Sequence, residues 1–173
     1  MYKFDEELLS LNEKYYDHLL KSVYRSCKLD EKVNNLKELI EMPQIYFDAA
    51  SKGNPGESCC ACVIITDDAR HHFVSCLGEM DNHRAEWEAL IFSIQHAIEL
   101  EVGNALIYTD SKLIADSIDK DYVKNATFKP YFELFKELER QFDLIFVKWI
   151  PRSQNKEANQ LAQTALRKQL KHK

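Results

Sequence analysis

The spacing of apolar residues divides the chain at about residue 43. Before that point apolar side chains recur at helical intervals, at Leu8, Tyr15, Leu19 and Val23. A second helix is expected to begin at Asp30, whose side chain can accept hydrogen bonds from first-turn N–H groups, and Pro43 closes the segment. Residues 1–43 are therefore predicted to form a helical N-terminal extension of unassigned role, next to a domain that spans 44–173.

From Gln44 the pattern becomes that of strands. QIYFDAA is a β-branched and aromatic run, the turn string KGNPG follows it, and SCCACVIIT is a second strand-like run. The pair predicts a hairpin. A third apolar stretch, RHHFVSCLGEM, completes an antiparallel meander.

The rest of the chain alternates helices and strands. A long helix has one apolar stripe, made of Trp87, Leu90, Ile91, Ile94 and Ile98. Gly103 is expected to end it. The apolar run ALIYTD is typical of a buried parallel strand, and Ser111 is expected to cap the short helix that follows. Pro130 suits the first turn of another helix, after which come the strand LIFVKWI and a closing helix from about Ser153. The predicted order is βββαβααβα, an α/β domain.

Composition limits the choice of function. With 173 residues and 45% hydrophobic content, the chain can bury one sizeable core. The net charge is −5, so nucleic-acid binding would depend on local basic groups or metal ions. The basic end RKQLKHK is read as a solvated helix end. The start is acidic and no apolar run approaches the roughly 20 residues that span a bilayer, so a cytoplasmic protein without a membrane partner is expected.

The five cysteines suit a reducing compartment better than a disulfide framework, because their number is odd and three crowd one predicted strand. Cys59 and Cys62 have CxxC spacing, but strand alternation would point them to opposite faces, and no second CxxC completes a zinc site. They are expected to be small buried residues.

Three carboxylates occupy places where chemistry is common. Asp48 ends the first strand and Asp110 ends ALIYTD, where ligands of open α/β sheets bind. If these strands are neighbours, the two carboxylates repel unless a cation lies between them. Asn82 is expected to cap the long helix, which places Glu86 in its first turns, pointing across the sheet end. Each residue alone also fits an ordinary role, as a turn former, a helix-entry residue or a carboxylate favoured by the helix dipole.

Four segments, DAASKGNPG, NHRAEWEAL, YTDSKLI and PRSQNKEANQLA, resemble in order and spacing the signature segments of the ribonuclease HI family. The resemblance covers residues 44 to about 168. It implies a ribonuclease H-like fold, with a five-stranded mixed sheet of order 3-2-1-4-5 and helices on both faces. It also implies endonucleolytic hydrolysis of the RNA strand of RNA/DNA hybrids, which leaves 5′-phosphate and 3′-hydroxyl ends.

The same resemblance implies the site residues. Asp48, Glu86 and Asp110 match the family's metal-binding carboxylates, which hold two Mg²⁺ or Mn²⁺ ions with Asp48 between them. The fourth family carboxylate falls on Asn159, whose amide oxygen can still coordinate a metal or position a water, so a weakened second metal site is expected. Three polar positions match those that contact the hybrid: Asn54, Asn82 and Ser111.

Some departures from the family keep other functions open. Ala49 stands where the family usually has glycine, a basic protrusion is absent, and Arg152 lies near the place of a mobile histidine. Asn159, Ala49 and the acidic net charge leave open a protein that binds hybrids or a protein partner without cutting. Another nuclease of the same fold, such as an exonuclease or junction resolvase, is a further alternative because fold does not fix substrate. The GNPG turn and the QNKEANQLA helix argue against it.

Overall fold

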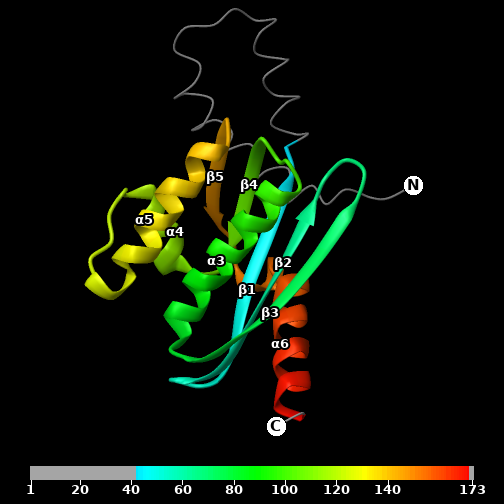
Figure 1. Cartoon of the computed structure of the whole chain (residues 1–173), viewed down its shortest axis with the longest axis vertical. Helices are drawn as coiled ribbons and strands as arrows, with labels where there is room; N and C mark the ends of the chain where they lie inside the picture. Colours follow the sequence, from blue (N-terminus) through cyan, green and yellow to red (C-terminus); the bar gives the residue numbers. More distant parts are fainter. Residues whose placement is uncertain (1–41, 172–173) are drawn as a thin grey trace, which may run out of the picture. The chain divides into compact units, whose positions relative to one another are not determined.

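A five-stranded mixed sheet forms the centre of the computed structural model, which describes residues 42–171. Its strands are β1 (Gln44–Gly53), β2 (Gly56–Ile65), β3 (Arg70–Met80), β4 (Asn104–Thr109) and β5 (Leu144–Trp149). Their order is β3-β2-β1-β4-β5, with the first three antiparallel and β1, β4 and β5 mutually parallel (Figure 1). The sheet order implied by the family resemblance is confirmed. The helices predicted before Pro43 lie outside the described residues.

Within residues 42–171, four α-helices accompany the sheet in the predicted order: α3 (Asn82–Glu99), α4 (Lys112–Asp119), α5 (Lys129–Leu138) and α6 (Lys156–Lys171). In Figure 1, α3, α4 and α5 form one group and α6 lies apart from them. Phe47 belongs to the core with α3, whereas the next residue, Asp48, contacts α6 through Asn159. Because successive side chains of a strand point to opposite faces, α3 and α6 cover opposite faces of β1.

The main hydrophobic core lies between the sheet and α3. Its largest fully buried side chains include Phe47, Ile45, Ile64, Trp87, Leu90 and Ile94. Each of these contributes roughly 1.5–3 kcal/mol through removal of apolar surface from water. The predicted stripe of the long helix therefore forms the buried side of α3. Within residues 42–171, no helix is long and apolar enough to cross a membrane.

The turn between β1 and β2 explains the sequence KGNPG. Gly53 has φ +101°, in the left-handed region that favours glycine, and a Cβ added at Gly56 would lie 2.0 Å from the Lys52 carbonyl oxygen. Gly53 and Gly56 are paired at the end of the β1–β2 ladder. The predicted hairpin is confirmed, and its turn holds Asn54 at the tip.

The start of α3 differs from the prediction. The N-cap is Asp81 rather than Asn82, because the Asp81 carboxylate accepts a hydrogen bond from the Arg84 N–H at 3.0 Å. Asn82 is the first helical residue, and its own N–H donates to Asn54 Oδ1 at 3.1 Å. The predicted cap was wrong by one residue, and the correct arrangement ties the helix start to the β1–β2 turn.

Two further helix boundaries were also misplaced. α3 ends at Glu99, before Gly103, because the Leu100 N–H returns to the His96 carbonyl and Glu101 takes a positive φ of 57°. α6 begins at Lys156 rather than near Ser153, since residues Arg152–Gln154 form a separate 3₁₀ turn. The other two predicted starts hold, with Ser111 at the N-cap of α4 and Pro130 in the first turn of α5.

The β2 cysteines are buried, as predicted. Cys59 and Cys62 each have no exposed surface, and Cys62 belongs to the core under α3. Cys59 belongs to the opposite face of the strand and lies 2.9 Å, sulfur to sulfur, from Cys76 on β3. These residues and Cys60 are free thiols. Burial raises the pKa of the Cys62 thiol to about 12, so it packs as a small apolar residue.

Candidate metal and nucleic-acid site

Parallel pairing of β1 with β4 brings two aspartates side by side. Asp110 directly follows β4, but Asp48 lies in the middle of β1 and not at its end as predicted, because β1 continues to Gly53 in its pairing with β2. The ladder pairs Tyr46 with Tyr108, so the same offset aligns Asp48 with Asp110 two residues farther on. Asp48 is 9% exposed and Asp110 is half-buried. The sequence predicted that the two aspartates would lie side by side if these strands were neighbours. The strands are neighbours, and the aspartates are aligned.

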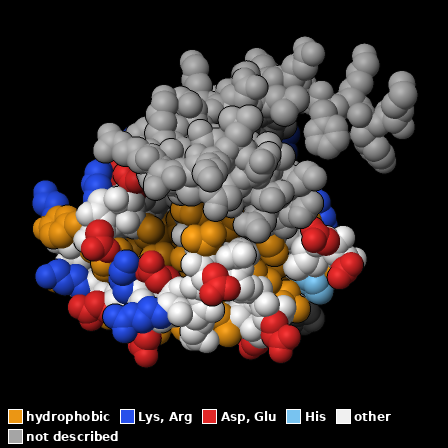
Figure 2. All heavy atoms as spheres, turned by 90° about the horizontal axis from the view of Figure 1, so that it is seen from above, with side chains coloured by type: hydrophobic (Ala, Val, Ile, Leu, Met, Phe, Trp, Pro, Cys, Tyr) orange, Lys and Arg blue, Asp and Glu red, His pale blue; other side chains and the backbone are white. Residues whose placement is uncertain are grey.

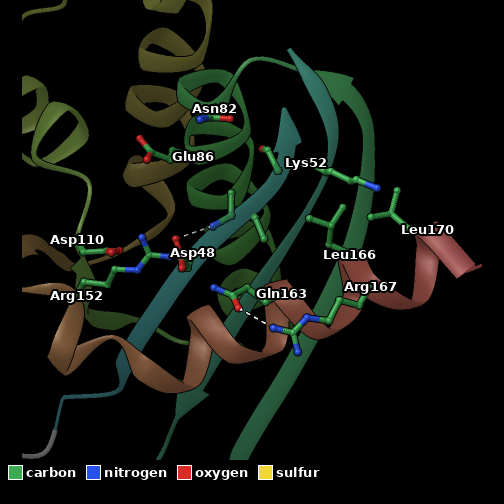
Figure 3. Close-up of a pocket in the computed structure, with 13 residues that line it drawn as sticks. Asp48, Lys52, Asn82, Glu86, Asp110, Arg152, Gln163, Leu166, Arg167 and Leu170 are labelled. Carbon is green, nitrogen blue, oxygen red and sulfur yellow. Dashed lines mark hydrogen bonds between the residues drawn. The ribbon is translucent and has the colours of Figure 1, made fainter. Parts of the chain in front are cut away.

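Glu86 approaches this pair from α3. Its carboxylate accepts a hydrogen bond from the Ser111 hydroxyl at 2.6 Å, and His83 Nδ1 lies 3.5 Å from the same oxygen, Oε2. Ser111 directly follows Asp110 at the end of β4, so this hydrogen bond joins α3 to the strand end that carries the second aspartate. Figure 3 shows Glu86 and Asp110 reaching one cavity from different elements.

That cavity has a volume of about 470 Å³ and contains charges of both signs. Its acidic lining residues are Asp48, Glu86 and Asp110, and its basic ones are Lys52, Arg152 and Arg167. In Figure 3 the Arg152 guanidinium extends toward the two aspartates, while Arg167 and Lys52 lie on the far side of Asp48. The arrangement suits a ligand that carries phosphates together with cations bound by the carboxylates.

Asp48 has the most strongly perturbed environment of the site. The pKa of its carboxyl is raised from 3.8 to about 6, chiefly by burial and also by the nearby charge of Asp110. A hydrogen bond from Asn159 Nδ2 to Asp48 Oδ2, 2.5 Å long, opposes this rise, as do the Ala49 N–H at 2.9 Å and the charge of Arg152. Asp48 is thus costly to ionise in this structure, which is the situation that a bound cation would relieve.

Asn155 orients the second aspartate, and the sequence argument gave it no role. Its Nδ2 donates to Asp110 Oδ1 at 2.9 Å and to the Phe47 carbonyl at 2.8 Å, and the side chain is 1% exposed. One amide therefore ties the middle of β1 and the residue after β4 to the segment that precedes α6. Its place in the motif PRSQNKEANQLA was the available signal, since a buried asparagine there needs partners.

Asn159 and its neighbours on α6 complete the site. Asn159 presents its amide nitrogen to Asp48, while its Oδ1 accepts a hydrogen bond from Gln163 Nε2 at 3.1 Å. Gln163 lines the cavity and was not predicted. Its spacing of four residues from Asn159, one helical turn, was the signal that could have found it.

The three predicted hybrid-contacting residues divide into two groups. Asn54 and Asn82 are exposed and joined by a hydrogen bond, and Asn82 lines the cavity. Ser111 is buried, and its hydroxyl donates to Glu86. The first pair is accessible to a ligand as it stands, whereas Ser111 holds a carboxylate in place.

The donor set fits a hard divalent cation. Carboxylate and amide oxygens are the ligands that Mg²⁺ and Mn²⁺ prefer. Throughout residues 42–171, the structure brings no three His, Cys, Asp or Glu side chains close enough to share a metal ion. Asp48, Glu86 and Asp110 each accept a hydrogen bond from a different neutral side chain.

The distribution of surface charge fits a nucleic-acid-binding site that is confined to the cavity. In Figure 2 acidic and basic side chains are interspersed over the part of the face that is coloured by type. The net charge of −5 likewise gives no general attraction for a polyanion. Nucleic-acid binding would therefore depend on the basic residues and cations of the cavity.

Comparison with known proteins places the chain in a family. A model of the family described as reverse transcriptase-like matches residues 46–165. The Enterococcus faecalis protein named "Putative hydrolase EbsB" is 43% identical over 129 residues, which make up 73% of this chain and 96% of that protein.

Solved structures give the same answer. Ribonuclease H1 of the archaeon Halobacterium salinarum superposes with a TM-score of 0.70 at 27% identity, over 73% of this chain and 98% of that one. LC11-RNase H1, solved in complex with an RNA/DNA hybrid, gives a TM-score of 0.68 at 27% identity, over 74% and 99% of the two chains. The chain therefore has the ribonuclease H-like fold and belongs to the reverse transcriptase-like family of ribonuclease H-like hydrolases.

Proposed function

We propose that this chain is a metal-dependent endoribonuclease that hydrolyses the RNA strand of RNA/DNA hybrids and leaves 5′-phosphate and 3′-hydroxyl ends. The observation that carries the proposal is the meeting of Asp48, Glu86 and Asp110 at one cavity from three different elements. The likeness to a ribonuclease H1 solved with a hybrid supports the choice of substrate.

Two Mg²⁺ or Mn²⁺ ions would be held by Asp48, Glu86 and Asp110, with Asp48 between them. When bound, such ions supply an activated water and neutralise the charge on the leaving 3′ oxygen. The protein contributes position. Asn155 fixes Asp110 and Ser111 fixes Glu86, so each carboxylate keeps its direction before any ion arrives.

Substrate recognition would use the polar mouth of the cavity. Hybrids present 2′-hydroxyl groups across a wide, shallow minor groove, which short polar side chains can contact. Asn54 and Asn82, hydrogen-bonded to each other at the β1–β2 turn and the α3 start, are exposed and suitably short. Lys52, Arg152 and Arg167 supply positive charge for backbone phosphates.

The experiment is a cleavage assay with a labelled RNA/DNA hybrid, duplex RNA and duplex DNA, each in Mg²⁺ and in Mn²⁺. We expect cleavage of the hybrid alone. Asp110→Asn should reduce the rate by about 10²–10³-fold, the loss typical of removing one group that stabilises the transition state electrostatically. Asp68→Asn, in the exposed turn after β2, is the matched control and should cut like the wild type.

A second candidate is a protein that binds hybrids without cutting them. The observation in its favour is Asn159, which stands at the fourth acidic position of the family and turns its amide nitrogen to Asp48. Hybrid binding with no cleavage in either metal would establish this alternative. The absence of both binding and cleavage would contradict both candidates.

A further inference from the structure

A row of three polar side chains on α6 leads directly to Asp48. Asn159, Gln163 and Arg167 are spaced four residues apart, which places them one above the other on one face of the helix. They are hydrogen-bonded in series: Arg167 to Gln163 at 3.3 Å, Gln163 to Asn159 at 3.1 Å, and Asn159 to Asp48 at 2.5 Å. Figure 3 shows the outer pair, Gln163 and Arg167, at the edge of the cavity.

The order of donors and acceptors along this row is fixed by Arg167 at its outer end. A guanidinium has only donors, so the Gln163 atom that faces Arg167 must be the carbonyl oxygen Oε1. The Gln163 nitrogen is therefore left to face Asn159 and must meet an acceptor, which is Asn159 Oδ1. The Asn159 nitrogen is then the atom left for Asp48, whose ionised carboxylate is an acceptor only.

Asp48, at the inner end of the row, requires the same order of donors and acceptors independently. Asp48 is buried and close to the charge of Asp110, so its carboxylate gains from any donor that approaches it. The two ends of the row thus agree, since Arg167 requires an acceptor and Asp48 requires a donor. Two amides in series satisfy both requirements in one orientation only.

This orientation removes Asn159 from the set of metal-binding oxygens. Only the amide oxygen can coordinate a cation, and here that oxygen is engaged by Gln163 and turned away from Asp48. We propose, building on the function proposed above, that Gln163 and Arg167 are positioning residues that hold Asn159 as a hydrogen-bond donor to Asp48, so that the fourth position orients a metal ligand instead of supplying one.

The proposal gives the two asparagines of the α6 region matching tasks. Asn155 donates to Asp110 and Asn159 donates to Asp48, so each strand-borne aspartate has its own amide donor. Asn155 is 1% exposed and needs no outside help to keep its orientation, because it also donates to the Phe47 carbonyl. Asn159 is only half-buried, and the Gln163–Arg167 pair supplies the constraint that burial supplies for Asn155.

The test uses one substitution to exchange the donor and acceptor between residue 163 and Asn159. In Gln163→Glu the new carboxylate only accepts, so it accepts from Arg167 and also from the Asn159 nitrogen. The Asn159 oxygen then faces Asp48 and becomes available to a cation. Gln163→Leu removes the constraint without adding charge. Gln160→Glu, at an exposed position on the same helix, controls for added charge.

Mn²⁺ binding is measured by electron paramagnetic resonance on the full chain without nucleic acid, beside thermal unfolding to confirm that each variant folds. We expect Gln163→Glu to bind Mn²⁺ about tenfold more tightly than the wild type, and Gln163→Leu about threefold more tightly. The reason is that the Asn159 oxygen becomes available to the cation in both variants. Gln160→Glu should stay within about twofold of the wild type. Equal affinities in Gln163→Glu and Gln160→Glu would overturn the proposal.

A second readout does not depend on metal binding. The side-chain amide signals of Asn159, identified by their loss in Asn159→Asp, are followed by nuclear magnetic resonance. They should move on Asp48→Asn in the wild-type background and stay in place on Asp48→Asn in the Gln163→Glu background. Insensitivity to Asp48 in the wild type would overturn the proposal. Neither readout involves cleavage, so failure of the proposed ribonuclease activity is recognised separately, by the hybrid assay.

Discussion

The two faces of β1 differ in what satisfies their side chains. Toward α3, Phe47 is 1% exposed among apolar neighbours, and its burial is favourable at any pH. Toward α6, the adjacent Asp48 is 9% exposed and is accommodated by donors from Asn159 and Ala49 and by the charge of Arg152. The first face stabilises the fold, and the second is costly to the fold. Two adjacent residues of one strand therefore have different roles: Phe47 stabilises the fold, and Asp48 belongs to the proposed chemical site.

The largest expected effect is on the core face. Trp87 has no exposed surface and is the largest of the fully buried side chains, so Trp87→Ala should lower the free energy of unfolding by roughly 3–5 kcal/mol. Urea unfolding followed by circular dichroism measures it. Trp149→Ala, at a side chain that is 47% exposed, should lose less than about half as much. Similar losses in the two variants would contradict the assignment of the core.

On the face of β1 toward α6, a substitution is expected to raise the free energy of unfolding instead of lowering it. The folded-state pKa of Asp48, about 6, lies above the ordinary 3.8, so its contribution to stability is full below about pH 4 and is lost as pH rises through 6. In EDTA at pH 8, Asp48→Asn should therefore raise the free energy of unfolding by about 3 kcal/mol, two pKa units, and by far less at pH 4.

The control for this prediction is Asp68→Asn, which replaces an exposed aspartate in the turn between β2 and β3. It should leave stability nearly unchanged at both pH values. A loss of stability in Asp48→Asn at pH 8 would show that the carboxylate stabilises the fold, against the comparison drawn between the two faces.

Asn155 joins β1 to the end of β4, since it donates to the Phe47 backbone carbonyl and to the Asp110 carboxylate. Asn155→Ala should cost about 1–3 kcal/mol of unfolding free energy because buried acceptors lose their donor. It should also lower kcat about tenfold through misplacement of Asp110, with little change in KM. Asn125→Ala, which removes an exposed cap of a 3₁₀ turn, should leave kcat unchanged. An unchanged kcat in Asn155→Ala would remove its positioning role.

The smallest expected effect concerns the fourth acidic position. Asn159→Asp restores a negative charge beside Asp48 and should raise cleavage in Mg²⁺ by several-fold, about 1 kcal/mol of barrier, with a smaller gain in Mn²⁺. Steady-state rates in the two metals measure it. No change in the Mg²⁺ rate would mean that the missing charge does not limit activity.

The sheet and the core were predictable because they depend on local periodicity. The alternation around Phe47 and the helical stripe through Trp87 each predict one element and its buried side. Boundaries were less predictable: Asp81 and Asn82 are both good N-cap residues, and only the hydrogen bond from the Asn82 N–H to Asn54 shows which of them lies inside the helix.

The carboxylates of the candidate site were also predictable, since Asp48 and Asp110 lie at matching positions of strands whose parallel pairing could be anticipated, although β1 continues past Asp48 to Gly53. Their hydrogen-bond partners were not. Asn155 and Gln163 lie 45 residues or more from the aspartates that they contact directly or through Asn159, and no local pattern encodes contacts of that range. Nor does the sequence show which end of the Asn159 amide faces Asp48, because that follows from the order of donors along α6.

The most direct test of the proposed ribonuclease activity is the chemistry of the cut ends. A DNA strand with one internal block of ribonucleotides, paired with DNA, is cleaved in Mg²⁺ in H₂¹⁸O, and the products are analysed by mass spectrometry. We predict cuts within the ribonucleotide block, with 3′-hydroxyl ends and ¹⁸O in the new 5′-phosphate, because water is the nucleophile. Cuts in the DNA segments, or 2′,3′-cyclic phosphate ends without ¹⁸O, would contradict the account.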